Sequence, residues 1–293
     1  MTCTVRYDLA MSCSIRVMTE ADIAVGMRLK EQAGWNQTEE DWRTFLALGP
    51  SGCFVAERDG VPVGTVTSWL FDRVAWIGMM LVDTALRRQG VGTRLLQHAV
   101  QHVERLGAAS VRLDATEFGE PLYVQNGFVE QFRLTRYGGV PNKPAVDAAM
   151  LKDTELNVTV LDDEIEALDR EVSNAQRGEY LRRLVKMDGA QCLVHRTGAV
   201  HGFVLTRPRA RVRFVGPCIA SDGDLGRALL TSAIARSPIE RVVIDVPVDH
   251  NQANKVVAEL GLERERDLIR MCRGDDRRED LSAYWASSGP ELG

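Results

Sequence analysis

The chain has 293 residues, of which 45% are hydrophobic and 26% are charged, so its length and composition predict two globular domains with full cores. Its net charge of −5 argues against a nucleic-acid or membrane-surface partner, and no stretch has the roughly 20 consecutive apolar residues that span a bilayer. The six cysteines form no Cys-x-x-Cys pair and no signal peptide is evident, so we expect reduced thiols in a cytoplasmic protein.

In the first half of the chain, strands alternate with helices after an initial hairpin, which is typical of a mixed α/β sheet. Asp59-Gly60 is a strong turn signal between the two hairpin strands. The nearly unbroken apolar run from Val74 to Val82 predicts a central strand that is covered on both faces. Strands are predicted over 14–17, 53–58, 62–71, 74–82, 111–115 and 129–137, and helices over 90–106 and about 119–126.

The second half repeats these elements in the same order. The stretch VRLDA at 111–115 recurs as VVIDV at 242–246, and NGFVE at 126–130 matches LGLER at 260–264. We therefore predict two copies of one fold, over 14–145 and 155–293, each completed by its own last strand. In the second copy, strands are predicted over 157–161, 191–196, 199–206, 211–219, 241–246 and 263–272, and helices over 224–236 and 250–260.

Three further segments lie outside the repeated elements. Residues 138–154 contain two glycines and two prolines and are predicted to link the copies. The charged run 274–280 is expected to form a solvated loop. The apolar stretch 281–286 after it is expected to form a last strand, docked on either sheet.

A turn rich in glycine and arginine follows the predicted central strand and precedes a helix. It runs from Arg87 to Gly92. Such a turn can present several backbone N–H groups, the positive end of a helix dipole and arginine side chains to one anion. Because the protein is acidic overall, this local arrangement indicates a phosphate-bearing ligand.

The sequence Arg87-Arg88-Gln89-Gly90-Val91-Gly92 resembles the Arg/Gln-x-x-Gly-x-Gly signature of the GCN5-related N-acetyltransferases (GNATs). About 30 residues later, Pro121 to Phe128 resembles the Leu-Tyr-x-x-x-Gly-Phe segment of that family. The resemblance implies an α/β fold of two tandem GNAT-like domains, each a twisted mixed sheet flanked by helices, with acetyl-CoA as donor and no metal. The positions it implies for cofactor binding are Met80, Leu81, Val82, Arg87, Arg88, Gln89, Gly90, Val91, Gly92, Thr93 and Asn126.

The second copy departs from this signature. It has Asp222 and Asp224 in the loop, where the first copy has arginines, and Val257 at the position of Tyr123. Carboxylates would repel a pyrophosphate, and a valine cannot donate a proton. We therefore expect a degenerate, non-catalytic second domain that packs against the first and shapes its acceptor pocket.

Tyr123 is the candidate general acid, since a phenol can supply a proton to a departing thiolate. Its alternative role is to cover the packing of a helix on a strand. The general base stays unassigned, because the central strand carries no carboxylate; Asp83, Asp114, Glu117 or a water relay are the options. His98 and His102 are spaced i, i+4, as in a metal pair, but they have no third ligand and are expected on a solvated helix face.

The acceptor site is expected where Trp35, Asn36 and Gln37 precede a predicted helix cap at Thr38. The leading hypothesis is an acetyl-CoA-dependent N-acetyltransferase in which a small amine attacks the thioester directly. The carboxylates near the domain boundary favour a cationic amine. The alternatives are a protein N-acetyltransferase and a non-catalytic acyl-CoA sensor. The identity of the amine, the acyl-chain preference and the oligomeric state do not follow from the sequence.

Overall fold

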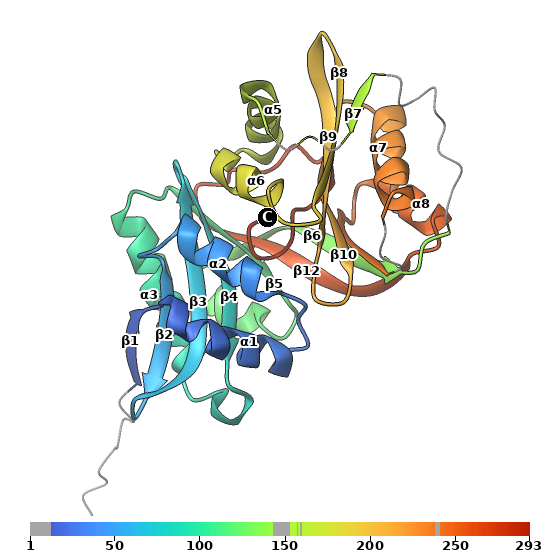
Figure 1. Ribbon diagram of the computed structural model, residues 1–293. Helices are drawn as coiled ribbons and strands as arrows, with labels where there is room; N and C mark the ends of the chain where they lie inside the picture. Colours follow the sequence, from blue (N-terminus) through green and yellow to red (C-terminus); the bar gives the residue numbers. More distant parts are fainter. Residues whose placement is uncertain (1–12, 143–152, 157, 159, 238–240) are drawn as a thin grey trace, which may run out of the picture.

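The fold is seen in a computed structural model that describes residues 13–142, 153–156, 158, 160–237 and 241–293 (Figure 1). Its thirteen described strands form one mixed sheet, in the order β1-β2-β3-β4-β5-β12-β6-β11-β10-β9-β8-β7, with β13 paired to β10. The elements of the first copy are β1 (Cys13–Val17), α1 (Ile23–Gln32), α2 (Glu39–Leu48), β2 (Cys53–Arg58), β3 (Val61–Phe71), β4 (Val74–Val82), α3 (Val91–Arg105), β5 (Ser110–Ala115), α4 (Glu120–Gln125) and β6 (Val129–Gly139).

The second copy repeats this order, as the repeat predicted. Its first strand is three residues long and lies before the predicted range 157–161, of which positions 157 and 159 lie outside the described residues. Its elements are β7 (Thr154–Leu156), α5 (Asp163–Ser173), α6 (Gly178–Leu184), β8 (Gln191–Thr197), β9 (Ala199–Pro208), β10 (Arg213–Ala220), α7 (Gly223–Ala235), β11 (Val242–Pro247), α8 (Asn251–Glu259), β12 (Glu263–Gly274) and β13 (Tyr284–Ala286).

The two copies exchange their last strands, which corrects the expectation that each copy is completed by its own. β12, from the second copy, pairs antiparallel with β5 of the first. β6, from the first copy, pairs antiparallel with β11 of the second, and β6 and β12 pair with each other. In Figure 1 these two long strands cross the middle of the molecule and join its halves. The sheet is continuous because of this exchange.

Two buried ion pairs hold the exchanged strands in register. Arg270 on β12 binds both carboxylate oxygens of Asp114 on β5, at 2.5 and 3.1 Å. Arg136 on β6 binds both oxygens of Asp245 on β11, each at 2.7 Å. Asp114 and Asp245 are the equivalent residues of the sequence repeat, so each copy supplies the arginine for the other's aspartate. Removing one partner of such a pair leaves a buried charge uncompensated, at a cost of about 3–5 kcal/mol.

The helices form separate cores on the faces of the sheet. α3 covers β2, β3 and β4 of the first copy, and α7 and α8 cover the second copy. The third core is shared, because α1 and α2 of the first copy and α5 and α6 of the second pack in one continuous cluster. Figure 1 shows α2 and α6 facing each other at this junction. The buried ion pair of Asp41 with Arg209, at 2.5 Å, crosses between the copies here.

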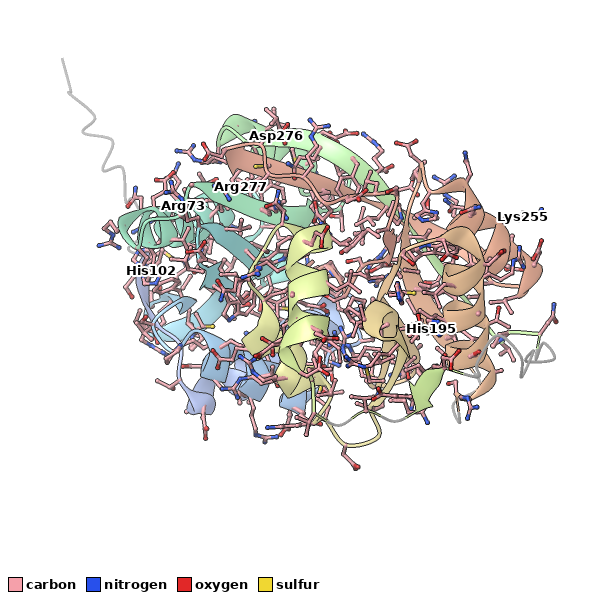
Figure 2. All side chains as sticks on the ribbon, turned by 90° about the horizontal axis from the view of Figure 1, so that it is seen from above. Arg73, His102, His195, Lys255, Asp276 and Arg277 are labelled. Carbon is pink, nitrogen blue, oxygen red and sulfur yellow. The ribbon has the colours of Figure 1, made fainter. Side chains whose placement is uncertain are left out.

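The segment 274–280 is only partly solvated, which corrects the sequence prediction. Asp276 lies at the surface (Figure 2), but Glu279 is buried and pairs with Arg270 and Arg112. The buried position follows from charge balance, because two buried guanidiniums need more than the single carboxylate of Asp114. The described cysteines, 13, 53, 192, 218 and 272, are buried and free, whereas Cys3 lies outside the described residues. No helix in the described ranges is long and apolar enough to cross a membrane.

Candidate active site

The first copy opens where its two parallel central strands part. β4 and β5 pair only from Val74 with Ser110 to Trp76 with Arg112. β4 continues to Val82 with a bulge in its pairing to β3, where Met79 has a positive φ of 48° and its carbonyl accepts a hydrogen bond from Thr65 Oγ1 at 2.9 Å. The bulge interrupts the regular β3–β4 ladder near the end of β4, beside the gap.

The arginine-glycine loop lies between the end of β4 and the start of α3, as predicted. α3 begins at Val91, and the preceding Gly90 has a φ of 84°, which a residue with a side chain adopts at a cost. No side chain caps the helix, so its first N–H groups stay available to an anion. Arg87 donates to the Val82 carbonyl at 3.2 Å, and its guanidinium lies 5.8 Å from the Phe118 ring centre. Arg88 and Gln89 are exposed beside it.

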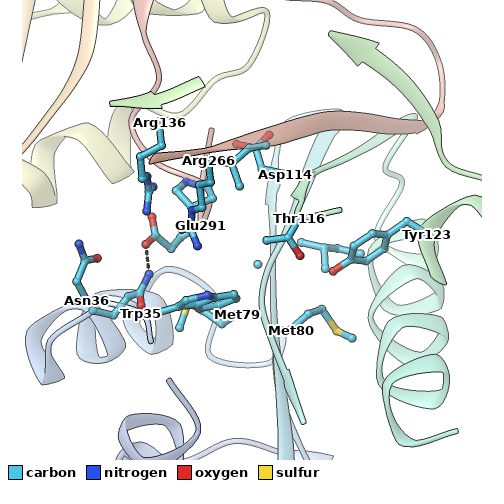
Figure 3. Close-up of a pocket in the computed structure, with 15 residues that line it drawn as sticks. Trp35, Asn36, Met79, Met80, Asp114, Thr116, Tyr123, Arg136, Arg266 and Glu291 are labelled. Atoms are coloured by element: carbon cyan, nitrogen blue, oxygen red, sulfur yellow. Dashed lines mark hydrogen bonds between the residues drawn. The ribbon is translucent and has the colours of Figure 1, made fainter. Parts of the chain in front are cut away.

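A pocket enclosing about 520 Å³ of space, part of it continuous with solvent, adjoins this gap (Figure 3). It brings together Tyr123, Met80, Trp35, Asn36 and Gln37, all of which the sequence singled out. Other predicted positions lie outside its walls. Leu81 points into the core, Val82 lies beside Gly92 in the loop region, and the Asn126 amide binds the Leu122 carbonyl and Gln97. The remaining lining residues are Ile77, Gly78, Met79, Asp114, Thr116, Arg136, Arg266, Leu268, Pro290 and Glu291.

Tyr123 lies in α4 and is 8% exposed, with its ring edge-on to Phe128 at 6.0 Å. In Figure 3 its hydroxyl points toward the pocket, beside Thr116 and Met80. Burial raises the pKa of Tyr123 above its ordinary value of 10. The phenol is therefore protonated at neutral pH, as a proton donor must be.

The second copy contributes four of the pocket's residues, none of which the sequence singled out. Arg266 and Leu268 come from the exchanged strand β12, and Pro290 and Glu291 come from the segment after β13. Glu291 accepts from Gln37 and pairs with Arg209 at 3.2 Å. Burial alone would raise the pKa of Glu291. The guanidiniums of Arg209 and Arg207 lower this pKa by more than burial raises it, so the net shift is downward. No local sequence signal marks these residues, because only the strand exchange brings them here.

The carboxylates considered for a general base are otherwise engaged or lie elsewhere. Asp114 lines the pocket but is held by Arg270. Asp83 pairs with Arg28 and caps the short helical turn Thr84–Leu86, and Glu117 is exposed outside the pocket. His98 and His102 are half-exposed on α3, and both rings also lie edge-on to Phe54, at 4.5 and 5.2 Å.

In the second copy the corresponding gap is occupied by the chain itself. β10 and β11 pair only from Arg213 with Val242 to Val215 with Ile244. Beyond that point β13 pairs with β10, and the N–H of Ser287 donates to the Asp245 carbonyl of β11 at 2.9 Å. This places the predicted last strand on the second copy's part of the sheet, inside the gap.

The helix start in the second copy is closed as well. The Asp222 carboxylate caps α7 by accepting from the Leu225 N–H at 2.9 Å. Trp285 of β13 packs directly on Gly226, so closely that a Cβ at that glycine would overlap the indole. The helix N-terminus therefore already has its anionic partner.

Comparisons with known proteins agree with this architecture. The model of the acetyltransferase (GNAT) family matches residues 24–128, and a model of an acetyltransferase (GNAT) domain matches residues 165–285. The uncharacterized N-acetyltransferase YitH of Bacillus subtilis (strain 168) is 26% identical over 249 residues, covering 82% of this chain and 84% of that protein.

A second curated relative and two solved structures are similar over nearly the whole chain. The holothin acyltransferase of Pseudoalteromonas sp. (strain SANK 73390) is 26% identical and covers 88% of this chain and 87% of that protein. A putative acetyltransferase from Pyrococcus horikoshii superposes with a TM-score of 0.85 at 22% identity, covering 96% of each chain. A tandem GNAT protein from the clavulanic acid biosynthesis pathway has a TM-score of 0.63 at 17% identity, covering 90% of this chain and 98% of that one.

The structures at these identities establish the fold, and the two family models establish the kind of enzyme. GNAT acetyltransferases take their acyl group from acetyl-CoA. The chain therefore belongs to the GNAT family, as an acyltransferase with two GNAT domains in tandem.

Proposed function

We propose that this protein is an N-acetyltransferase that transfers the acetyl group of acetyl-CoA to a small amine by direct attack of the amine on the thioester. One observation carries the proposal. A single pocket at the open end of the β4/β5 gap joins Tyr123 and the end of β4 to side chains of both copies.

The pyrophosphate of acetyl-CoA would bind at the arginine-glycine loop. The uncapped start of α3 offers backbone N–H groups, and Arg87 and Arg88 add positive charge. The pantetheine arm would follow β4 past Val82 and Met80 toward the pocket, where the strand has no β5 partner.

Tyr123 would donate its proton to the departing thiolate. The raised pKa keeps the phenol protonated at neutral pH but also makes it a weaker acid, so its contribution falls at the lower end of the 10²–10⁴-fold typical of general acids. No carboxylate that lines the pocket is free to act as base, since Asp114 is held by Arg270 and Glu291 by Arg209. We infer that the acceptor loses its proton to water.

We further infer that only the first copy binds acetyl-CoA. In the second copy β13 lies in the gap, Trp285 covers Gly226, and Asp222 caps the helix that would otherwise face a phosphate. The second copy instead supplies one side of the acceptor pocket. A polypeptide acceptor is disfavoured, because Pro290 and Glu291 of that copy form part of the pocket wall and Glu291 binds Gln37 on the opposite side. A cytoplasmic location stays a prediction.

The test is a thiol-release assay with acetyl-CoA and a panel of small amines, with a panel of short peptides as the comparison. We expect thiol release that depends on a small amine and saturates with its concentration. Binding of acetyl-CoA without turnover on any amine or peptide would identify an acyl-CoA sensor. Turnover on peptides alone would identify a protein N-acetyltransferase. Either result would overturn the proposal.

A further inference from the structure

Arg266 stands out among the charged groups of the pocket because it has no partner. It lies on β12, the strand that the second copy contributes to the first, and its half-buried side chain lines the pocket. Its Nε is buried without a hydrogen-bond acceptor. Within the described part of the chain, the Arg266 side chain has no hydrogen-bond or salt-bridge partner. A buried guanidinium without a partner loses hydration and gains nothing in exchange.

Every other charge in the pocket wall is balanced by a neighbour. Arg136 is bound by both oxygens of Asp245, and Asp114 is bound by Arg270. Glu291 accepts from Gln37 and pairs with Arg209, and its attraction to the nearby Arg266 is weaker than an ion pair. The pocket therefore carries one uncompensated positive charge, on Arg266.

The surroundings of Arg266 destabilise its charged form relative to an arginine in water. Burial, and after it the like charge of Arg136, lowers the pKa of Arg266 from its ordinary value. The nearby Glu265 is engaged by Arg241. A guanidinium has a reference pKa above 12, so Arg266 stays charged despite this shift, and the unpaired charge persists until a ligand brings an anion.

We propose that Arg266 binds a carboxylate of the acceptor, so that the acceptor is a small amine that also carries a carboxylate group. This inference rests on the proposed function and specifies its substrate. The planar guanidinium matches a carboxylate in geometry, and one carboxylate balances the one free charge. A phosphate monoester would bring about −1.5 to −2 charges at neutral pH and leave the pocket with excess negative charge.

The positions of Arg266 and Tyr123 agree with such a molecule. In Figure 3 Arg266 lies on one side of the pocket and Tyr123 on the other, with Asp114 and Thr116 between them. A carboxylate at Arg266 would leave the amine end of the acceptor directed toward Thr116 and Tyr123, where the thioester would lie. Of the carboxylates behind the expectation of a cationic amine, Asp222 and Asp224 do not line this pocket.

The experiment compares matched acceptors on wild-type protein and on Arg266→Met. Each pair consists of an amino acid and its carboxamide, and a third arm offers phosphoethanolamine against ethanolamine. We expect wild-type kcat/KM to be about 10–100-fold higher for the acid than for the amide, mostly through KM. Arg266→Met should remove that preference and leave the amide and the KM for acetyl-CoA unchanged. Arg266→Lys should keep part of the preference.

Arg264→Met is the matched control, because Arg264 lies on the same strand, is exposed and pairs with Asp267. It should behave as wild type. The melting temperature separates recognition from structure. Replacing an unpaired, half-buried guanidinium by a methionine should leave the melting temperature equal or higher, whereas a structural role of Arg266 would lower it. Equal turnover of acids and amides, or a preference that survives Arg266→Met, would overturn this inference and leave the proposed function intact. A preference for phosphoethanolamine would also overturn it. If no amine were acetylated, the proposed function itself would be contradicted.

Discussion

The two copies keep the same parted central strands but fill the gap between them differently. In the first copy β4 and β5 separate after Trp76 and Arg112, and the gap leads to the pocket. In the second copy β10 and β11 separate after Val215 and Ile244, and β13 occupies the gap. A short segment of the same chain thus takes the place that an extended ligand would need. The comparison indicates that the second copy has lost the space for such a ligand while it keeps the fold.

The same segment connects the two gaps. After β13 leaves the second copy's gap, the chain continues to Pro290 and Glu291 in the wall of the first copy's pocket. The Glu291 carbonyl lies so close to Gly78 of β4 that a Cβ there would be only 2.6 Å away. The copy that has lost its open gap therefore helps to form the pocket of the copy that keeps it.

Trp285→Ala should produce the largest effect, because it empties the second gap. The indole is 1% exposed and packs on Gly226 and His250, so its removal leaves a cavity worth about 3–5 kcal/mol of unfolding free energy. Urea unfolding measures this loss. Trp35→Ala is the control, since Trp35 is half-exposed in the pocket and its removal should cost much less. An equal or smaller loss for Trp285→Ala would mean that β13 is not a structural part of the second copy.

Substitution of the loop glycine should lower acetyl-CoA affinity in the first copy but only stability in the second. A Cβ at Gly92 would lie 3.6 Å from Leu122, an ordinary contact, so the Gly92→Leu variant should fold. Its larger side chain should obstruct the loop and lower the acetyl-CoA affinity by at least about 10²-fold. Gly226→Ala would collide with Trp285 and should cost about 1–3 kcal/mol of stability without changing acetyl-CoA affinity.

Isothermal titration calorimetry and thermal unfolding on both variants separate these effects. Wild-type protein should bind one acetyl-CoA per chain. Two bound equivalents, or a loss of affinity in both variants, would show that the second copy also has a cofactor site.

Tyr123→Phe tests the candidate proton donor of the first copy, which the second copy replaces by Val257. The change keeps the ring packed against Phe128 and removes the proton, so kcat should fall by about 10²-fold while the acetyl-CoA affinity and melting temperature stay unchanged. Steady-state kinetics with saturating acetyl-CoA measures it. A near-normal kcat would mean that Tyr123 has a packing role and is not the general acid.

The sequence was sufficient to predict most of the strands and the helices α3, α4, α7 and α8, but not the way the copies are joined. Helices and strands follow from local periodicity and turn signals, which occur in both copies of the repeat. The strand exchange does not follow, because Asp114 and Asp245 would find an equivalent arginine in either arrangement. The pocket was predicted in part: Trp35 and Tyr123 belong to recognisable segments of the first copy. Arg266 and Glu291 lie more than 100 residues from Tyr123 and reach it only through the exchanged strand and the segment after β13.

The smallest expected effect concerns alkaline pH, and it depends on the burial of Tyr123. A general acid works only while protonated, so activity is lost as the pH rises through its folded-state pKa. Burial raises that pKa above 10, and the loss should therefore begin only above about pH 10. The acceptor amine must be neutral to attack, so kcat/KM should rise with pH until the amine is deprotonated and then stay level to about pH 10. A pH series at saturating acetyl-CoA, with Tyr123→Phe as the control, measures both limbs. A fall in wild-type kcat/KM between pH 8 and 9.5 that is absent in Tyr123→Phe would mean that the phenol titrates in this range, and that the hydroxyl is not shielded from water as its burial indicates.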